Sequence, residues 1–244
     1  MKPINHNMDL LIQTKSSNCV QTAVSQLLTF FGKKLSPDVI EKAVPVRFND
    51  EGLPLGTLLP DIGSWLMDTQ DLDTTLHVFD AQLIDRSWTG IPRDEIVANL
   101  EKLRQTGVTT ARTPYAKILI DSYCSFLDKG GRLDITFCTT QLITSLLKKA
   151  PLLAIVNYNY LYNAPRCAYD AVTKEYQPNS IDGKVIGHAI VITGYEDGVF
   201  TINDPDCEKG GKNRVERDVL IGAICAEQIS SNNFLLSLTP KHAN

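Results

Sequence analysis

The pattern of apolar residues changes at Pro151, and this change restricts the possible folds more than any other feature of the chain. Before Pro151, apolar residues recur at steps of three and four, which is typical of amphipathic helices. After it, short β-rich runs separated by turn residues cover 152–158, 187–195, 199–203 and 234–238. Helices first and strands later predict an α+β fold, in which N-terminal helices pack on a C-terminal, mainly antiparallel sheet.

Several segments carry helix signals as well as the helical spacing. The first begins at Cys19 and ends before Gly32, a candidate C-terminal cap. A second opens at Ser36-Pro37, a serine N-cap followed by proline at the first helical position. A short strand is expected at 76–79. The expected helices cover 19–31, 37–43, 57–67, 93–105, 115–127 and 140–149.

The chain carries no sign of division into separate domains. It has 244 residues, 43% of them hydrophobic, with no internal repeat and no linker rich in proline, glycine and serine. This composition is typical of a globular protein that can bury a sizeable core. We therefore expect a single domain over 1–244, with a helical elaboration at about 48–132.

The charge balance excludes several kinds of partner. The 24 basic residues against 28 acidic ones give a net charge of −4, so a basic surface for nucleic acid is not expected. No apolar run is long enough to span a membrane or to serve as a signal peptide. We therefore expect a cytoplasmic protein, with export by a non-cleaved route left open. These features leave the oligomeric state undetermined.

The spacing of cysteines and histidines argues against a metal centre. Six cysteines are spread along the chain without a Cys-x-x-Cys pair, so free thiols are expected. A zinc site needs Cys and His ligands at short, recurring spacings, and the four histidines have no such neighbours. We therefore expect neither a metal nor another cofactor.

Cys19 is the first candidate catalytic residue. It opens the helix expected at 19–31, where Ser17 or Asn18 can serve as the N-cap. The N-terminus of a helix lowers the pKa of a thiol and so favours the nucleophilic thiolate. On its own, however, such a cysteine is more simply explained as a small buried side chain on the first helical turn.

Gln13 lies six residues before Cys19, across a polar loop that can fold back on the start of the helix. A glutamine amide in that place could donate a hydrogen bond to an oxyanion, beside the backbone N–H of Cys19. Without this spacing, Gln13 would be an ordinary solvated side chain. Gln13 is therefore the second candidate.

His188 stands apart from the other histidines. It follows Gly187 at the start of an apolar run, where a strand can deliver its side chain from the edge of the core into a cleft. The alternative is a hydrogen-bonded core histidine. Its role therefore depends on which side chain the next strand places beside it.

The register of the two strands on either side of 196–198 determines which residue lies beside His188. A three-residue loop places Ile190 opposite Asp204, so that His188 and Asp204 share one face within side-chain reach. A two-residue type I′ turn shifts the pairing by one residue and brings Asn203 to that face instead. We favour Asp204, because this register keeps the apolar residues of both strands together. A carboxylate beside an imidazole orients it for proton transfer.

Tyrosines and asparagines alternate directly after the first β-rich run. Alternation of this kind is typical of a strand. We therefore expect Tyr158, Tyr160 and Tyr162 at the end of a strand that emerges into a loop, where they could line a substrate cleft.

These residues together resemble a known family. The sequence is similar to the C39-like branch of papain-fold cysteine peptidases in the order of three motifs. These are a glutamine six residues before a cysteine at the start of an apolar helix, the Gly-His motif at Gly187-His188, and Asp204 before a proline. The resemblance implies a papain-like fold. It implies Cys19 as nucleophile, His188 as general base and later acid, Asp204 as the orienting group and Gln13 as an oxyanion donor.

The resemblance also implies a reaction. A thiolate attacks the carbonyl of a peptide or small acyl or amide substrate, and an acyl-enzyme then passes its acyl group to water. Two alternatives stay open: an acyltransferase or cyclising enzyme with an amine acceptor, and a binding module without turnover. The run Asn18-Cys19-Val20 departs from the Asp-Cys-Gly common in the family, and the branched Val20 could crowd the cleft.

Overall fold

The structure is a computed structural model that describes residues 2–48, 54–78, 83–106, 116–173, 175–226 and 233–241. The chain forms two compact units. The first unit comprises Met1–Thr57 and Cys138–Ile229, and the second comprises Leu58–Phe137 and Ser230–Asn244. The single domain over 1–244 with an elaboration at 48–132 stays a prediction.

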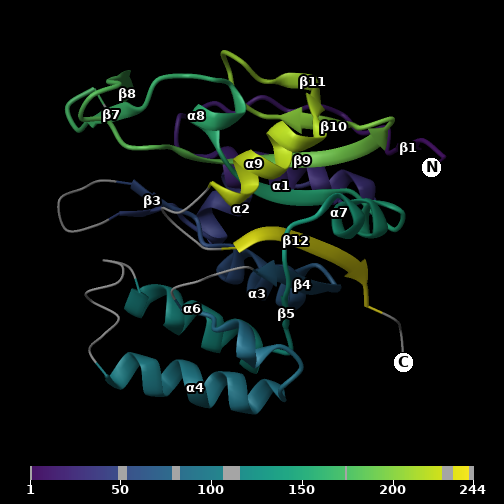
Figure 1. The fold of residues 1–244 in the computed structure, drawn as a ribbon, viewed down its shortest axis with the longest axis vertical. Coiled ribbons are helices and arrows are strands. Elements are labelled where there is room, and N and C mark those ends of the chain that lie inside the picture. The colour runs from purple at the N-terminus through teal and green to yellow at the C-terminus, as the bar shows by residue number, and fades with distance from the viewer. Residues whose placement is uncertain are drawn as a thin grey trace. The chain divides into compact units, whose positions relative to one another are not determined.

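A mainly antiparallel sheet runs through the first unit (Figure 1). Its central strand β9 (Gly187–Glu196) pairs with β6 (Leu152–Asn157) on one side and with β10 (Val199–Asp204) on the other. Beyond β10 lies β11 (Gly211–Glu216), and the short β1 (Ile4–Asn5) pairs with the end of β9. The strands expected around residues 152–203 are therefore present, and each of these pairings is antiparallel.

Helix α1 (Cys19–Phe30) packs against β9. Its apolar stripe is buried, and the members of that stripe are Val20, Ala23, Val24, Leu27 and Leu28. Gly32 follows the helix with φ of 72°, the left-handed conformation expected of a C-terminal cap. An N-terminal helix thus packs on the antiparallel sheet, and the predicted α+β class is confirmed.

The other elements of the first unit are short. Its further helices are α2 (Pro37–Ala43), α7 (Thr140–Leu147), α8 (Tyr158–Leu161) and α9 (Arg217–Cys225). Two-stranded ribbons are formed by β2 (Arg47–Phe48) with β3 (Pro54–Gly56) and by β7 (Cys167–Asp170) with β8 (Glu175–Pro178). The sequence predicted α2 and α7 but neither α9 nor the ribbons.

The second unit is described by its own strands and helices. Strand β4 (Leu72–Val78) pairs antiparallel with β12 (Asn233–Pro240) and parallel with β5 (Arg132–Ile135). The helices are α3 (Leu59–Thr69), η1 (Arg86–Trp88), α4 (Arg93–Gln105) and α6 (Ala116–Asp128). Residues 79 and 115, at the ends of an expected strand and an expected helix, lie outside the described residues.

His77 is a structural histidine of this second unit. It lies in β4, and its Nδ1 and Nε2 are 2.8 Å and 2.9 Å from Asp134 Oδ2 and Ser237 Oγ, one on each neighbouring strand. The side chain is 5% exposed. Because both ring nitrogens bond to neighbouring strands, His77 links the sheet and is not a candidate for catalysis.

The turn between β9 and β10 is not the predicted three-residue loop, so this prediction is wrong. Glu196 pairs with Val199, so that the loop consists of two residues. These two, Asp197 and Gly198, have φ of 46° and 88°, as a type I′ turn requires. The turn therefore follows the alternative register.

Further along the hairpin, the register returns to the predicted one. An irregularity between Thr201 and Ile202 shifts the pairing by one residue, so that Ile202 lies opposite Ile192. A β-bulge of this kind changes which side chains share a face. It brings Asp204 to the face of His188, for a reason that the sequence analysis did not include.

Residues 158–161 form helix α8 and not the end of a strand, so this prediction is wrong. The side chain of Asn157 accepts a hydrogen bond from the Tyr160 N–H at 2.9 Å and caps the short helix. In a helical turn, residues four apart lie on the same face. Tyr158 and Tyr162 are therefore neighbours, and their ring centroids are 5.0 Å apart.

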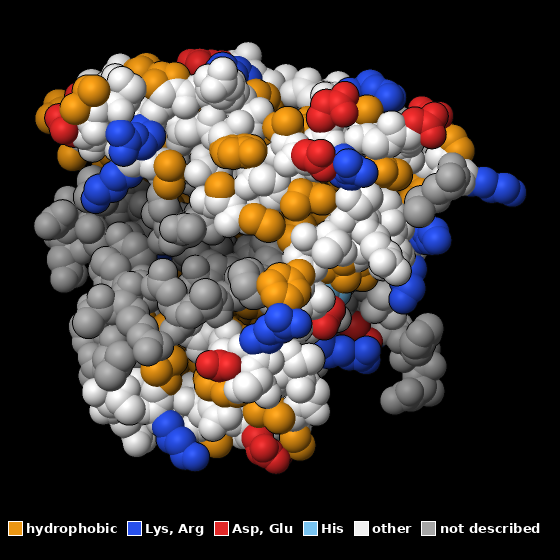
Figure 2. Space-filling view, viewed as in Figure 1, with side chains coloured by type: hydrophobic (Ala, Val, Ile, Leu, Met, Phe, Trp, Pro, Cys, Tyr) orange, Lys and Arg blue, Asp and Glu red, His pale blue; other side chains and the backbone are white. Residues whose placement is uncertain are grey.

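The surface agrees with the balanced charge of the sequence. On the face shown in Figure 2, basic and acidic side chains of the described residues are interspersed. Within the described ranges, no helix has the length and apolar character needed to cross a bilayer.

Candidate active site

Cys19 is the first residue of α1, as predicted, and Asn18 is the N-cap. The fully buried Asn18 side chain makes no capping hydrogen bond. Its Oδ1 instead accepts from the Lys15 N–H at 3.3 Å, and its Nδ2 donates to Thr14 Oγ1 at 3.5 Å. Asn18 thus holds the preceding loop together and does not occupy the first N–H groups of α1, next to the Cys19 thiol.

His188 lies between two of the other candidates, Cys19 and Asp204. Its Nε2 is 2.8 Å from Asp204 Oδ1, and the two side chains are 5% and 0% exposed. The Cys19 side chain also interacts with the imidazole and raises the pKa of His188. Because Asp204 occupies Nε2, Nδ1 is the ring nitrogen left for the sulfur. The structure therefore brings together residues of α1, β9 and β10.

The charges of this group favour an ionised histidine. Burial by itself lowers the pKa of His188, because it penalises the imidazolium form. The charge and hydrogen bond of Asp204, together with Cys19, outweigh burial and raise the pKa of His188 well above its ordinary value. Burial likewise raises the pKa of Asp204, but the charge and hydrogen bond of His188 lead to a net lowering.

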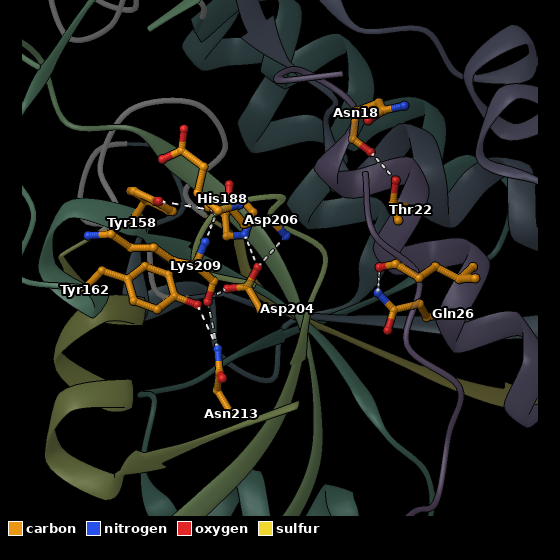
Figure 3. Close-up of polar contacts among 12 residues, drawn as sticks. Asn18, Thr22, Gln26, Tyr158, Tyr162, His188, Asp204, Asp206, Lys209 and Asn213 are labelled. Carbon is orange, nitrogen blue, oxygen red and sulfur yellow. Dashed lines mark hydrogen bonds and ion pairs between the residues drawn. The ribbon is translucent and has the colours of Figure 1, made fainter. Parts of the chain in front are cut away.

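Every oxygen of the Asp204 carboxylate has a donor. Oδ1 accepts from His188 and also from the Asp206 N–H at 2.8 Å. Oδ2 accepts from the Tyr162 hydroxyl. Figure 3 shows these groups converging on Asp204. The carboxylate is therefore held in one orientation toward the imidazole.

Asn203, the alternative neighbour of His188, makes a hydrogen bond elsewhere. Successive residues of a strand point to opposite faces of the sheet, so Asn203 and Asp204 diverge. The Nδ2 of Asn203 donates to the main-chain oxygen of Asp9 at 3.4 Å. Of the two side chains considered from the sequence, Asp204 is the one beside the imidazole.

Gln13 is buried close to the end of β10. Its main-chain N–H donates to the Pro205 oxygen at 2.7 Å, which ties the loop before Cys19 to the residue after Asp204. The side chain is 7% exposed, and its Oε1 has no hydrogen-bond partner within the described part of the chain. The loop thus folds back toward the site, as the spacing predicted.

Two tyrosines of the site were missed as such by the sequence analysis. Tyr158 packs edge-on against the imidazole of His188, with centroids 5.5 Å apart, and Tyr162 contacts Asp204. Both come from α8. Their spacing of four residues directly after Asn157, a good N-cap residue, is the signal that could have indicated a helical turn here.

Tyr176 of β8 approaches the site from a ribbon that the sequence did not predict. Burial, followed by the interaction with Cys19, raises the pKa of Tyr176 to about 12. Its ring packs against that of Tyr169 on the paired strand, with centroids 5.2 Å apart. No local pattern links this ribbon to Cys19.

A pair of thiols lies elsewhere in the same unit. Cys138 and Cys225 are free thiols, and the interaction with Cys138 lowers the pKa of Cys225 to about 7 against the opposing effect of its burial. Cys225 is exposed. We therefore expect thiol reagents to label Cys225 at neutral pH, so labelling experiments must distinguish Cys225 from Cys19.

Replacing Cys138 by alanine is expected to slow the alkylation of Cys225 about threefold at neutral pH, since the thiolate fraction falls while the intrinsic nucleophilicity rises. Iodoacetamide labelling followed by mass analysis of the Cys225 peptide measures this rate. The exposed Cys207 in the same sample is the internal control. An unchanged Cys225 rate would contradict the coupling of the two thiols.

The described residues offer no ligand set for a metal ion, since no group of three or more His, Cys, Asp or Glu side chains lies together there. The reactive groups of the site are a thiol, an imidazole and a carboxylate in series. A thiol beside an oriented imidazole is suited to nucleophilic attack on a carbonyl group.

Both the sequence and the fold resemble known proteins. The model of the Peptidase_C39 like family matches residues 5–223. The crystal structure of a Bacillus anthracis protein assigned as a C39-like peptidase is similar, with a TM-score of 0.51 and 13% sequence identity, over 98% of each chain. At this identity the likeness concerns the fold. No curated protein matches the sequence.

Proposed function

The chain belongs to the Peptidase_C39 like family, and on that premise we propose that it is a thiol hydrolase that cleaves a peptide or other amide bond. One observation carries the proposal: the imidazole of His188 is hydrogen-bonded to the Asp204 carboxylate and interacts with the Cys19 side chain. The family and the fold support a cysteine peptidase-like function. The roles of the individual residues are part of the proposal.

The first step is formation of the nucleophile. The raised pKa of His188 favours transfer of the Cys19 proton to the imidazole. The N-terminus of α1 stabilises the resulting thiolate through the helix dipole. The sulfur then attacks the carbonyl carbon of the substrate, and the carbonyl π electrons move to the oxygen.

The negative oxygen needs donors at the moment when its charge develops. The backbone N–H of Cys19 and the side-chain amide of Gln13 are the proposed donors. Asn18 does not use its side chain to cap these first N–H groups of α1, and Gln13 is buried in the adjoining loop. Fixed donors in a water-poor site stabilise an oxyanion without having to reorganise.

Two proton transfers complete the reaction. The His188 imidazolium gives its proton to the leaving amine as the C–N bond breaks, which leaves the acyl group on Cys19. His188 then accepts a proton from the attacking water, the C–S bond breaks, and the acid is released with the thiolate restored. Asp204 keeps the ring in one orientation through both steps.

Replacing Gln13 by alanine is expected to slow acylation of Cys19 about a hundredfold, because one oxyanion donor is lost. The main-chain bond from residue 13 to Pro205 does not depend on the side chain and persists in the variant. The rate at which the acyl adduct appears in the intact-mass spectrum measures the effect. An unchanged rate would remove Gln13 from the oxyanion site.

A panel of peptides and activated acyl donors, followed by intact-mass measurement, tests the proposed function. We expect an acyl adduct on Cys19 and release of the free acid, with neither in the Cys19→Ala variant. Product joined only to an added amine would instead favour acyl transfer. A wild-type protein that forms no adduct and no product with any donor would contradict the proposal.

A further inference from the structure

We infer that Tyr162 is a positioning residue, whose hydroxyl holds the Asp204 carboxylate in the orientation that aligns His188 with Cys19. The inference rests on the proposed function and extends it to a residue outside the Cys-His-Asp series. It starts from the contact between the Tyr162 hydroxyl and Asp204 Oδ2 (Figure 3).

Asp204 depends on its donors because it is completely buried. Its side chain is 0% exposed, so water does not reach the carboxylate. Oδ1 has two donors, from His188 and from the Asp206 N–H, whereas Oδ2 has the Tyr162 hydroxyl. A buried carboxylate oxygen without a donor is costly. Loss of this hydroxyl therefore favours rotation of the carboxylate toward other donors.

The direction of the Tyr162 proton follows from its other neighbour. Asn213 Nδ2 donates to the Lys209 main-chain oxygen at 3.0 Å, and this carbonyl, which can only accept, fixes the orientation of the amide. The same Nδ2 lies 3.4 Å from the Tyr162 hydroxyl oxygen and donates to it. The hydroxyl oxygen accepts on that side, and its own proton is free to point to Asp204.

The surroundings of Tyr162 keep its ring in place and its hydroxyl protonated. The ring packs against that of Tyr158, and the Lys209 ammonium lies 5.6 Å from the ring centroid. Burial, followed by the charge of Asp204 and then the effect of Asp206, raises the pKa of Tyr162 above its ordinary value. The hydroxyl is therefore a permanent donor to Asp204.

The effect of Tyr162 on Cys19 passes through two side chains, those of Asp204 and His188. Helix α8 positions Tyr162, Tyr162 positions Asp204, and Asp204 positions the imidazole that exchanges a proton with Cys19. Replacing Tyr162 by phenylalanine removes one oxygen atom and keeps the ring. We expect the carboxylate to lose its fixed orientation, so that the imidazolium is less stabilised and the Cys19 thiolate forms at higher pH.

The test is the rate of iodoacetamide alkylation of Cys19 as a function of pH, read from the mass of the Cys19 peptide so that Cys225 does not interfere. In Tyr162→Phe, the rate at mildly acidic pH is expected to fall about tenfold, the effect of one hydrogen bond to a charged group. Tyr160→Phe is the matched control. It makes the same change two residues earlier in the chain, in a residue that is 52% exposed.

Three further variants separate the possible outcomes: Asp204→Ala, its combination with Tyr162→Phe, and His188→Ala. If Tyr162 acts through Asp204, adding Tyr162→Phe to Asp204→Ala causes no further loss, whereas independent effects multiply. His188→Ala tests the proposed function itself and should abolish the acid-pH reactivity. Reactivity lost in His188→Ala but unchanged in Tyr162→Phe overturns this inference and leaves the proposed function standing.

A purely structural role for Tyr162 gives a different result. Tyr162→Phe would then lower the melting temperature while leaving the pH profile of Cys19 alkylation unchanged, and this outcome also overturns the inference. If His188→Ala leaves the profile unchanged as well, the proposed function and the inference are both wrong.

Discussion

Hydrolysis is expected to stop when Cys19 is replaced by alanine, with kcat/KM falling at least about a thousandfold, because no other group of the site can carry the acyl intermediate. Cys19 opens α1 and interacts with His188. The measurement is the hydrolysis rate of the donor that forms the adduct. Circular dichroism of the variant shows whether α1 and the sheet persist.

Cys207→Ala is the matched control for this variant. Cys207 is an exposed free thiol outside the site, so its removal should leave the hydrolysis rate unchanged. Residual hydrolysis in Cys19→Ala at more than a few per cent of the wild-type rate would show that another group performs the attack. A loss in both variants would point to a general requirement for free thiols.

Asp204→Ala is expected to reduce kcat/KM at least about a hundredfold, because the imidazole loses the group that orients it and stabilises its charge. Asp204→Asn should lose less, on the order of tenfold, since the amide oxygen can still accept from Nε2. We therefore expect kcat/KM to increase in the order Asp204→Ala, Asp204→Asn, wild type. The hydrolysis rates of the two variants measure it.

Asp197→Asn makes the same carboxylate-to-amide change in the turn of the same hairpin. Asp197 is exposed and has positive φ, which asparagine tolerates, so activity should be retained. Equal activity in wild type and Asp204→Ala would contradict an orienting role. A defect in Asp197→Asn as large as that in Asp204→Ala would assign the effect to the hairpin as a whole.

The sequence predicted those parts of the fold that depend on neighbouring residues. The apolar spacing after Cys19 and the glycine at position 32 are local signals, and α1 begins and ends where they indicate. The same is true of α2 and α4. The resemblance to the C39-like peptidases, which depends on motifs in a fixed order, is confirmed by the family match.

The β9–β10 hairpin was predicted for the wrong reason. The residues Asp197 and Gly198 favour a type I′ turn, and this local preference decided the loop. Asp204 nevertheless reaches the face of His188, because the irregularity after Thr201 shifts the register. A bulge depends on packing across strands, and apolar alternation in a single strand does not indicate it.

The surroundings of the site gave weak or no patterns in the sequence, for two reasons. Helix α8 is four residues long, too short to produce a periodic signal, so its tyrosines were assigned to a strand. The ribbon that carries Tyr176 approaches Cys19 through tertiary folding alone. The residue pattern of a strand also does not indicate which other strand it pairs with. For example, β12 and β4 pair although they lie far apart in the sequence.

The pKa of His188, measured by NMR titration in the wild-type chain and in Cys19→Ser, tests the central claim most directly. The His188 resonance is assigned by its loss in His188→Ala. We predict a pKa above the ordinary histidine value in the wild type, and a lower one in the serine variant, because the sulfur helps to stabilise the imidazolium. Identical titration curves in both proteins would contradict the pairing of Cys19 with His188.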